Sequence, residues 1–197
     1  MLQAISASPA MPMVRCSGNN FHEIGKLLDA GAYSVICPLI QDAADAQRFV
    51  EACRYPPLGT RSFGPTRGFL YGGADYFDHA NDTVVTWAMI ETPESLRALD
   101  EICAVKGLDG IFVGPSDLSI SLGTKPPPRW RDAPLAGALE RCLSAARAAG
   151  KMAGIFCNTP EMAADMRRMG YHMIVLANDA TMLRGAAQQW LQGARKD

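Results

Sequence analysis

Short, continuous apolar runs alternate with segments of helical period along the whole chain. Six such runs are present, at residues 13–15, 34–39, 84–91, 110–113, 152–156 and 173–176. Because these runs are continuous rather than alternating, they are typical of parallel strands covered on both faces. A strand followed by a helix, six times over, predicts a parallel sheet with helical crossovers. The sheet is either open and doubly wound or part of a (β/α)8 barrel.

Residues that are typical of helix ends indicate where the helices between these runs begin and end. Asn20 and Glu23 have the spacing of a capping box, and Thr92 and Thr159 each precede a Pro and a Glu, as an N-cap residue does. Glycines follow three of the expected helix ends, at Gly31, Gly150 and Gly170. A final helix is expected over residues 180–191, with its apolar residues on one face.

The composition predicts one folded domain over residues 1–197. Hydrophobic residues make up 48% of the chain, and 19 basic against 20 acidic residues leave a net charge of -1. Nucleic acid is therefore not an expected partner, and no apolar run is long enough to cross a membrane. The cysteines, at positions 16, 37, 53, 103, 142 and 157, have no metal-binding spacing. We expect free, buried thiols rather than disulfides, and a cytoplasmic location.

Acidic side chains follow two successive strands of the predicted sheet. Glu91 ends the third run, and Asp117 follows the fourth run after Gly114, Pro115 and Ser116. Ligands gather at the carboxyl ends of parallel strands in both architectures. Two carboxylates that converge there suit Mg2+ or Mn2+. The alternative is that each residue only caps the helix that follows it.

An arginine and a turn at the same edge of the sheet are candidates for binding an anion. Arg15 ends the first run, where its planar guanidinium could hold a carboxylate or an oxyanion, or pair with a neighbouring acid. The turn formed by Gly114, Pro115, Ser116 and Asp117 would direct consecutive backbone N–H groups towards the same crevice.

Two connections are longer than a helix requires, and they are expected to be loops that shape a site or a subunit contact. They are residues 54–82, rich in Gly, Pro and aromatic residues, and the Pro-rich residues 124–134. The histidines at positions 22, 79 and 172 are expected to be surface or packing residues, with His79 kept as a candidate for a functional role.

Several short motifs in order along the chain resemble one family of enzymes. They are Val14-Arg15 and residues 36–41, 54–61, 89–92 and 110–119. Together they are similar to the metal-dependent class II pyruvate aldolases. That group includes 4-hydroxy-2-oxoheptanedioate and 2-dehydro-3-deoxyglucarate aldolases and is related to the citrate lyase beta chain. The resemblance covers essentially the whole chain.

The resemblance implies a (β/α)8 barrel and a lyase that cleaves a 4-hydroxy-2-oxo acid to pyruvate and an aldehyde through an enolate. It implies that Glu91 and Asp117 bind Mg2+ or Mn2+, with Co2+ as a further candidate. By the same resemblance, Arg15 contacts the enolate oxygen. The backbone at Ser116 and Asp117, in the turn that begins at Gly114-Pro115, is expected to hold the carboxylate of the 2-oxo acid. It also implies a homo-oligomer, commonly a hexamer with exchanged C-terminal helices.

The chain departs from the family pattern in two ways. Gly18-Asn19-Asn20 stands where the family often has Trp-Asn-Asp, and only six strand-helix units are visible, so the barrel is expected to lack its first two. Those units carry the family's catalytic histidine, and we expect its loss to weaken aldol cleavage but to spare oxaloacetate decarboxylation. The alternatives are an inactive paralogue or assembly subunit, and an acyl-CoA lyase like the citrate lyase beta chain.

Overall fold

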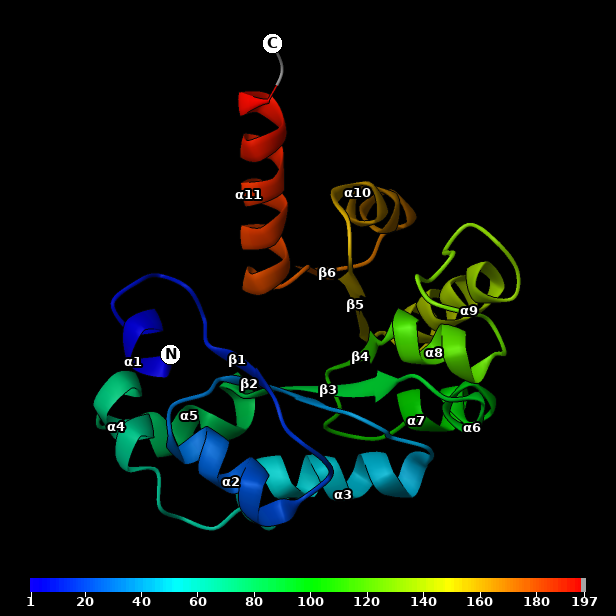
Figure 1. The fold of residues 1–197 in the computed structure, drawn as a ribbon. Helices are drawn as coiled ribbons and strands as arrows, with labels where there is room; N and C mark the ends of the chain where they lie inside the picture. Colours follow the sequence, from blue (N-terminus) through cyan, green and yellow to red (C-terminus); the bar gives the residue numbers. More distant parts are fainter. Residues whose placement is uncertain (196–197) are drawn as a thin grey trace.

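The computed structural model describes residues 1–195 and shows one curled, parallel sheet of six strands (Figure 1). The strands are β1 (Met13–Arg15), β2 (Ser34–Cys37), β3 (Val85–Ile90), β4 (Gly110–Val113), β5 (Met152–Cys157) and β6 (Met173–Leu176). Each strand pairs with its neighbours in sequence order, so β1 and β6 form the two edges. The sheet curls into a half-barrel, which confirms the predicted fold class with six strand-helix units.

Eleven helices are present in the described part of the chain. They are α1 (Leu2–Ile5), α2 (Phe21–Asp29), α3 (Ala43–Cys53), α4 (Thr66–Gly72), α5 (Tyr76–Thr83), α6 (Pro93–Arg97), α7 (Leu99–Cys103), α8 (Pro115–Ser121), α9 (Leu135–Ala148), α10 (Pro160–Met169) and α11 (Asp179–Ala194). Apart from α11, the helices after each strand lie on the outer side of the sheet (Figure 1).

The sequence signals for the helix starts act as predicted, with one difference. Thr92 and Thr159 are N-cap residues whose hydroxyls accept hydrogen bonds from the third residue of α6 and α10. Asn20 accepts a hydrogen bond from the N–H of Glu23 at 3.0 Å. The Glu23 carboxylate does not return to Asn20, because it accepts from the backbone N–H of Ser17 at 2.9 Å, so the predicted capping box is only half formed.

The expectation that residues 54–82 form a long loop is wrong for the part that follows residue 65. This segment contains α4 and α5, which pack on each other through aromatic rings. Tyr76 in α5 contacts Phe69 in α4 and Tyr33 beside β2 with ring centroids 6.0 and 6.1 Å apart. The Gly- and Pro-rich composition gives this segment a low helix propensity, so the sequence did not predict these helices. Tertiary contacts stabilise short helices that would not form from propensity alone. Residues 124–134 are a connection without a helix or strand, as expected.

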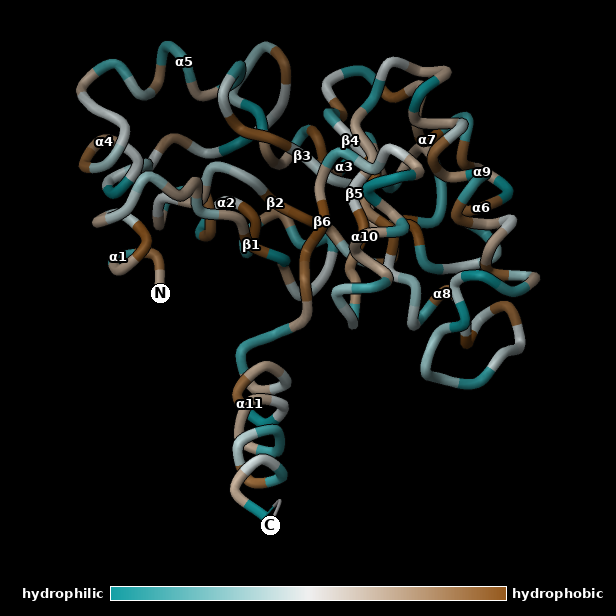
Figure 2. The backbone as a smooth tube through the Cα atoms, turned by 90° about the horizontal axis from the view of Figure 1, so that it is seen from above, coloured by the Kyte–Doolittle hydropathy of each residue, from teal (hydrophilic) through white to brown (hydrophobic). Residues whose placement is uncertain are grey.

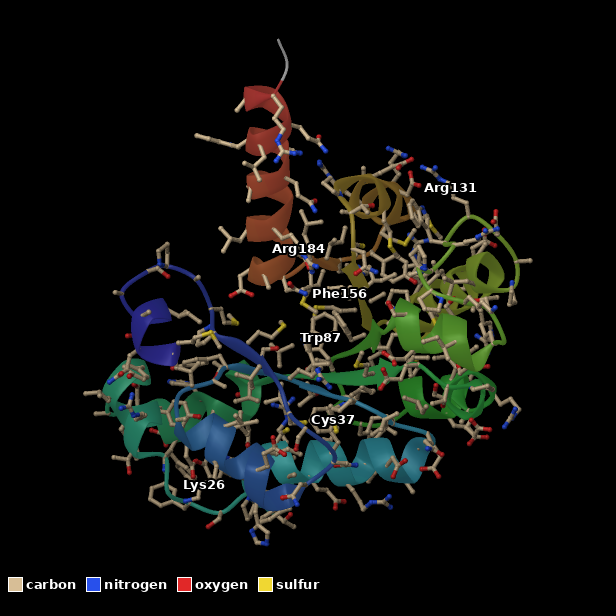
Figure 3. The ribbon with its side chains drawn as sticks, viewed as in Figure 1. Lys26, Cys37, Trp87, Arg131, Phe156 and Arg184 are labelled. Atoms are coloured by element: carbon tan, nitrogen blue, oxygen red, sulfur yellow. The ribbon has the colours of Figure 1, made fainter. Side chains whose placement is uncertain are left out.

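The core has two layers, one on each side of the sheet. The larger lies between the sheet and the outer helices, and all six cysteines are buried thiols, with Cys37 pointing towards α3 (Figure 3). The smaller lines the concave side and is built from Ile36, Trp87, Met89 and Phe112. The indole of Trp87 occupies the space beside Gly110, and its Nε1 donates to the Ser34 hydroxyl at 3.0 Å.

Helix α11 extends away from the sheet and has no buried residue (Figures 1 and 2). The apolar face that the sequence predicts for this helix is exposed in the structure. Within residues 1–195, no helix has both the length and the apolar character that crossing a bilayer would require.

Candidate active site

Glu91 directly follows β3 at the carboxyl ends of the strands, and its side chain lies on the concave side. Residues 87, 89 and 91 share this side because successive side chains along a strand alternate between faces. Glu91 is only 5% exposed, and its Oε1 accepts a hydrogen bond of 2.8 Å from the backbone N–H of Leu39, beyond the end of β2. The helix-cap alternative for Glu91 is wrong, since Thr92 caps α6.

Without a bound cation, the surroundings of Glu91 disfavour the charged form of its carboxyl. Burial raises the pKa of its carboxyl, and the negative charge of Asp117 raises it further. The hydrogen bond from the Leu39 N–H and the positive charge of Arg15 act in the opposite direction without cancelling the effect of burial. A buried carboxylate beside a second acid is stabilised by a bound cation.

Gly114 lets α8 begin against the Glu91 carboxylate. A β-carbon at Gly114 would lie 2.8 Å from Oε2 of Glu91 and 2.5 Å from Cε of Met89, so any side chain there would displace the ends of these two side chains. One carboxylate oxygen of Glu91 is therefore bound by Leu39, and the other faces the start of α8. The Gly114 N–H continues the β3–β4 ladder by donating to Ile90 at 3.2 Å.

The first turn of α8 contains the remaining predicted residues. Pro115 is its first residue, and Ser116 and Asp117 follow, with Asp117 exposed to solvent. Backbone N–H groups in the first turn of a helix have no intrahelical partner. The N–H groups of Ser116 and Asp117 are thus available to an anion. The helix-cap alternative is also wrong for Asp117, because the N-cap residue of α8 is Gly114 and no side chain caps this helix. Asp117 does occupy a first-turn position that the helix dipole favours.

Arg15 ends β1, two strands away from Glu91. It is exposed, and it lies on the same side of β1 as Met13, which packs on the concave core. The positive charge of Arg15 lowers the pKa of Glu91, and the negative charge of Asp117 raises it. Both charged groups are therefore near enough to affect the Glu91 carboxyl. These three residues and the turn at Gly114 lie at one end of the sheet, as the strand-end argument predicted.

The donors present fit a hard divalent cation that keeps open coordination positions. Among residues 1–195, no group of three or more His, Cys, Asp or Glu side chains is arranged to hold a metal ion. Two carboxylates on neighbouring strand ends leave the remaining positions to water and to oxygen atoms of a substrate, which is how Mg2+ is commonly bound. Glu91 and Asp117 would hold such an ion.

The histidines lie in other surroundings. Nδ1 of His172 accepts from the N–H of Ala153 at 3.1 Å, at the amino end of β5. Nε2 of His79, in α5, lies 3.5 Å from Oδ2 of Asp75, which precedes that helix. His22 makes an edge contact with Phe21. Leu39 lies within the motif at residues 36–41, but the sequence assigned it no role in the site. Its role depends on a backbone conformation that no sequence motif marked.

Two curated proteins and one solved structure show how closely the chain matches known enzymes. It is 43% identical to a hydroxypyruvate/pyruvate aldolase of Rhizorhabdus wittichii over 99% of its own length and 78% of that protein. It is 35% identical to a 4-hydroxy-2-oxo-heptane-1,7-dioate aldolase of Shigella flexneri, covering 95% of the chain and 70% of the relative. The crystal structure of an HpcH/HpaI aldolase/citrate lyase family protein from Burkholderia cenocepacia superposes on this chain with a TM-score of 0.91 and 32% identity. The match covers 99% of this chain and 78% of that one.

A more distant structure with a similar fold is described in complex with magnesium and acetoacetate. It is protein CitE of Mycobacterium tuberculosis, with a TM-score of 0.57 and 19% identity over 91% of this chain and 69% of that one. The model of the HpcH/HpaI aldolase/citrate lyase family matches residues 1–186. On this match and on the identities above, the chain belongs to the HpcH/HpaI aldolase/citrate lyase family, as the resemblance predicted.

Proposed function

We propose that this protein is a divalent-metal-dependent carbon-carbon lyase that acts on 2-oxo acids. The natural reaction would be cleavage of a 4-hydroxy-2-oxo acid to pyruvate and an aldehyde. The observation that carries the proposal is the Glu91 carboxylate, which is 5% exposed and lies beside the start of α8. The 43% identity to a hydroxypyruvate/pyruvate aldolase supports the choice of substrate class.

Glu91 and Asp117 would hold the cation, with Mg2+ and Mn2+ as the candidates and Co2+ as a third. When bound, a divalent cation supplies Lewis-acid stabilisation of the negative charge that develops on the keto oxygen of the substrate. The metal assignment is supported by the donor types and by the burial that raises the pKa of Glu91.

The other residues of the site would bind and orient the substrate. The N–H groups of Ser116 and Asp117 point away from the body of α8 and would hold the carboxylate of the 2-oxo acid. Gly114 lets the Glu91 carboxylate lie close to these N–H groups, because a β-carbon there would meet Glu91. The guanidinium of Arg15 would donate to the developing oxyanion, where preorganised donors act most strongly.

Proton transfer separates the two reactions open to such a site. Aldol cleavage breaks the bond between C3 and C4 only if a base removes the proton of the 4-hydroxyl group. None of the three histidines forms a hydrogen bond or an ion pair with Glu91 or Arg15 in the described part of the chain. Decarboxylation of oxaloacetate releases CO2 and leaves the electron pair on the enolate of pyruvate, which water then protonates. We therefore expect decarboxylation to be the stronger activity of this chain.

Titration calorimetry with Mn2+ and oxalate, a mimic of the pyruvate enolate, tests the proposal. The wild type should bind oxalate only when Mn2+ is present. Both Glu91→Gln and Asp117→Asn should weaken Mn2+ binding by about 100-fold, because each removes a charged ligand. Glu94→Gln is the matched control, since this exposed acid pairs with Arg97 at 2.8 Å and should bind Mn2+ like the wild type.

Oxaloacetate decarboxylation in the presence of Mn2+ distinguishes an enzyme from a binding protein. The proposal is abandoned if Glu91→Gln decarboxylates oxaloacetate at the wild-type rate. Metal-dependent oxalate binding without any turnover would instead support the alternative of an inactive paralogue.

A further inference from the structure

Leu39 has an unusual backbone conformation at the mouth of the half-barrel. Its φ is 55°, in the left-handed region, and its side chain is 58% exposed. Only one other non-glycine residue among residues 1–195 has a positive φ, Ala177 at 52°. A left-handed conformation is unfavourable for leucine because its β-carbon crowds the backbone. Such conformations persist only where the surrounding structure holds them, and they gather at functional sites.

The turn at Leu39 redirects a backbone N–H from the sheet to a side chain. The ladder between β2 and β3 ends at the pair Cys37 and Ala88, so the N–H of Leu39 is not needed for strand pairing. It donates instead to Oε1 of Glu91 at 2.8 Å, across 52 residues of sequence. At Ala177 the N–H donates to the Cys157 carbonyl at 2.8 Å, which only extends the ladder between β5 and β6.

This hydrogen bond fixes which oxygen of Glu91 faces the site. With Oε1 bound to Leu39, Oε2 lies against Gly114, at 2.8 Å from the position of a β-carbon there. The carboxylate is held on one side by a backbone donor and on the other by the start of α8. A metal ligand whose second oxygen is held in this way loses little freedom on binding a cation.

We propose that Leu39 is a positioning residue for Glu91, acting through its left-handed backbone rather than through its side chain. The inference rests on the proposed function in one respect, that Glu91 binds the divalent cation. It adds that the shape of the turn after β2 sets the affinity for that cation.

Substitutions that differ in their tolerance of the left-handed conformation test this role. Leu39→Val places a β-branched residue where such residues are least tolerated, whereas Leu39→Gly and Leu39→Asn accept the conformation. We expect the Kd for Mn2+, measured by electron paramagnetic resonance, to rise about ten-fold in Leu39→Val. Leu39→Gly and Leu39→Asn should stay within about three-fold of the wild type, although both lose the leucine side chain.

Ala177→Val is the matched control for strain. It introduces the same conformational conflict at the end of β6, where no contact with Glu91 is made, so its thermal stability should fall while its Mn2+ affinity stays unchanged. The inference is overturned if Leu39→Val binds Mn2+ like the wild type. It is equally overturned if Leu39→Gly is as weak as Leu39→Val, because the side chain would then be responsible.

The amide proton of Leu39 provides a second measurement that needs no metal. In the metal-free wild type its NMR resonance should lie downfield, as expected for a bond to a carboxylate, and should move upfield in Glu91→Gln. An unchanged resonance would contradict the inference. If the resonance moves but the wild type binds no Mn2+, the proposed function fails while the positioning of Glu91 by Leu39 stands.

Discussion

At the scale of single residues, the site is built around a carboxylate that the fold does not stabilise by itself. Glu91 is buried, its burial raises its pKa, and Asp117 adds a like charge. Arg15 and the N–H of Leu39 oppose these effects only in part. In the absence of a cation, Glu91 therefore reduces the stability of the folded chain at neutral pH, and this is the same property that makes it a good ligand.

Glu91→Gln should make the metal-free protein more stable at neutral pH. An acid whose pKa is raised in the folded state contributes stability below its ordinary value of 4.5, and this contribution is lost as the pH rises through the raised pKa. Gln at this position does not ionise, so Glu91→Gln loses no stability as the pH rises in this way. Its melting temperature should therefore exceed that of the wild type at pH 7. The difference should shrink towards pH 4, as measured by circular dichroism with a chelator present.

Glu94→Gln again serves as the control. A backbone hydrogen bond and Arg97 lower the pKa of Glu94, so its replacement should not raise the melting temperature at pH 7. If the melting temperatures of Glu91→Gln and the wild type differ by the same amount at every pH, the charge of Glu91 is not the cause of the difference.

Gly114→Ala should damage both stability and metal binding, because its β-carbon would lie 2.8 Å from Oε2 of Glu91. We expect a loss of about 1–3 kcal/mol in the free energy of unfolding and a roughly ten-fold weaker Mn2+ affinity. Gly137→Ala in α9 has nothing within 4 Å of its β-carbon and should instead stabilise by up to about 1 kcal/mol. Urea denaturation compares the two, and equal effects would contradict the packing argument.

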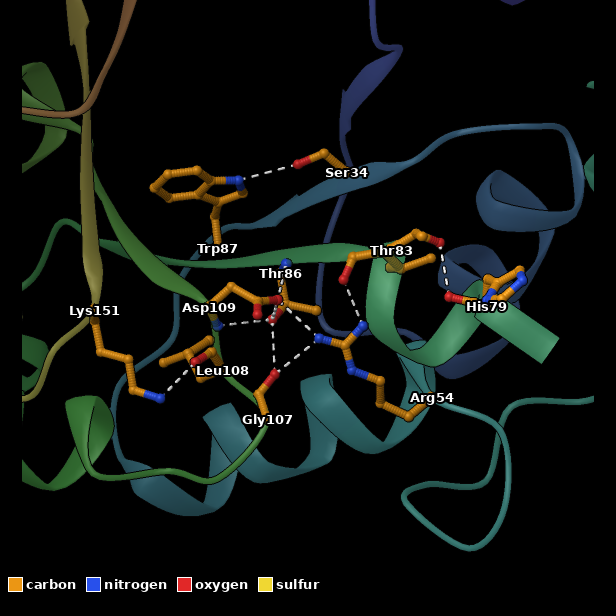
Figure 4. Close-up of polar contacts among 11 residues, drawn as sticks. Ser34, Arg54, His79, Thr83, Thr86, Trp87, Gly107, Leu108, Asp109 and Lys151 are labelled. Atoms are coloured by element: carbon orange, nitrogen blue, oxygen red, sulfur yellow. Dashed lines mark hydrogen bonds and ion pairs between the residues drawn. The ribbon is translucent and has the colours of Figure 1, made fainter. Parts of the chain in front are cut away.

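At the scale of elements, the two ends of the strands have separate roles. The carboxyl ends hold the candidate site, whereas the amino ends of β3 and β4 are joined by a polar network (Figure 4). Oδ2 of Asp109 accepts hydrogen bonds of 2.8 Å from Arg54 and from both the N–H and the hydroxyl of Thr86. Arg54 is 4% exposed and also donates to the Gly107 carbonyl at 3.0 Å. This division between a functional and a structural end is general in barrels of this kind.

Arg54→Met should destabilise the fold and leave the site intact. Removing one partner of a buried ion pair costs about 3–5 kcal/mol. Because the Asp109 side chain is 33% exposed, we expect the lower end of this range, which for a chain of this size lowers the melting temperature by roughly 10 °C. The Mn2+ affinity of the folded variant should match that of the wild type, since the network lies at the opposite ends of the strands. Arg97→Met, in an exposed pair with Glu94, is the control and should leave the melting temperature almost unchanged.

At the scale of the whole molecule, the most conspicuous feature is the exposed apolar face of α11. Leu183 and Trp190, seven residues apart on one face, are 74% and 83% exposed. Large apolar side chains gathered on an exposed surface mark an interaction site. We propose that α11 packs on other copies of the chain in a homo-oligomer, for which the family resemblance gives a hexamer as the expected size.

A double substitution in α11 tests the oligomer. Leu183→Asp with Trp190→Asp should lower the mass measured by light scattering towards that of one chain, while circular dichroism shows the fold retained. Gln188→Asp with Gln192→Asp adds the same charge to the opposite face and should leave the mass unchanged. A wild type that is already monomeric at high concentration would exclude this use of α11.

Local sequence determined much of this protein. Residues 13–15, 110–113 and 173–176 are strands with the predicted bounds, and Thr92 and Thr159 cap their helices as expected, because these features depend on neighbours in the sequence. The order of the strands fixed the end of the sheet at which Arg15, Glu91 and Asp117 gather. Only the tertiary structure decided that Leu39 holds Glu91 from 52 residues away, that residues 54–82 contain helices, and that α11 is exposed. The first two outcomes depend on contacts between distant segments, whose energies exceed the local preferences that a sequence pattern records. The exposure of α11 was decided in the same way, because no other segment of residues 1–195 buries any of its residues.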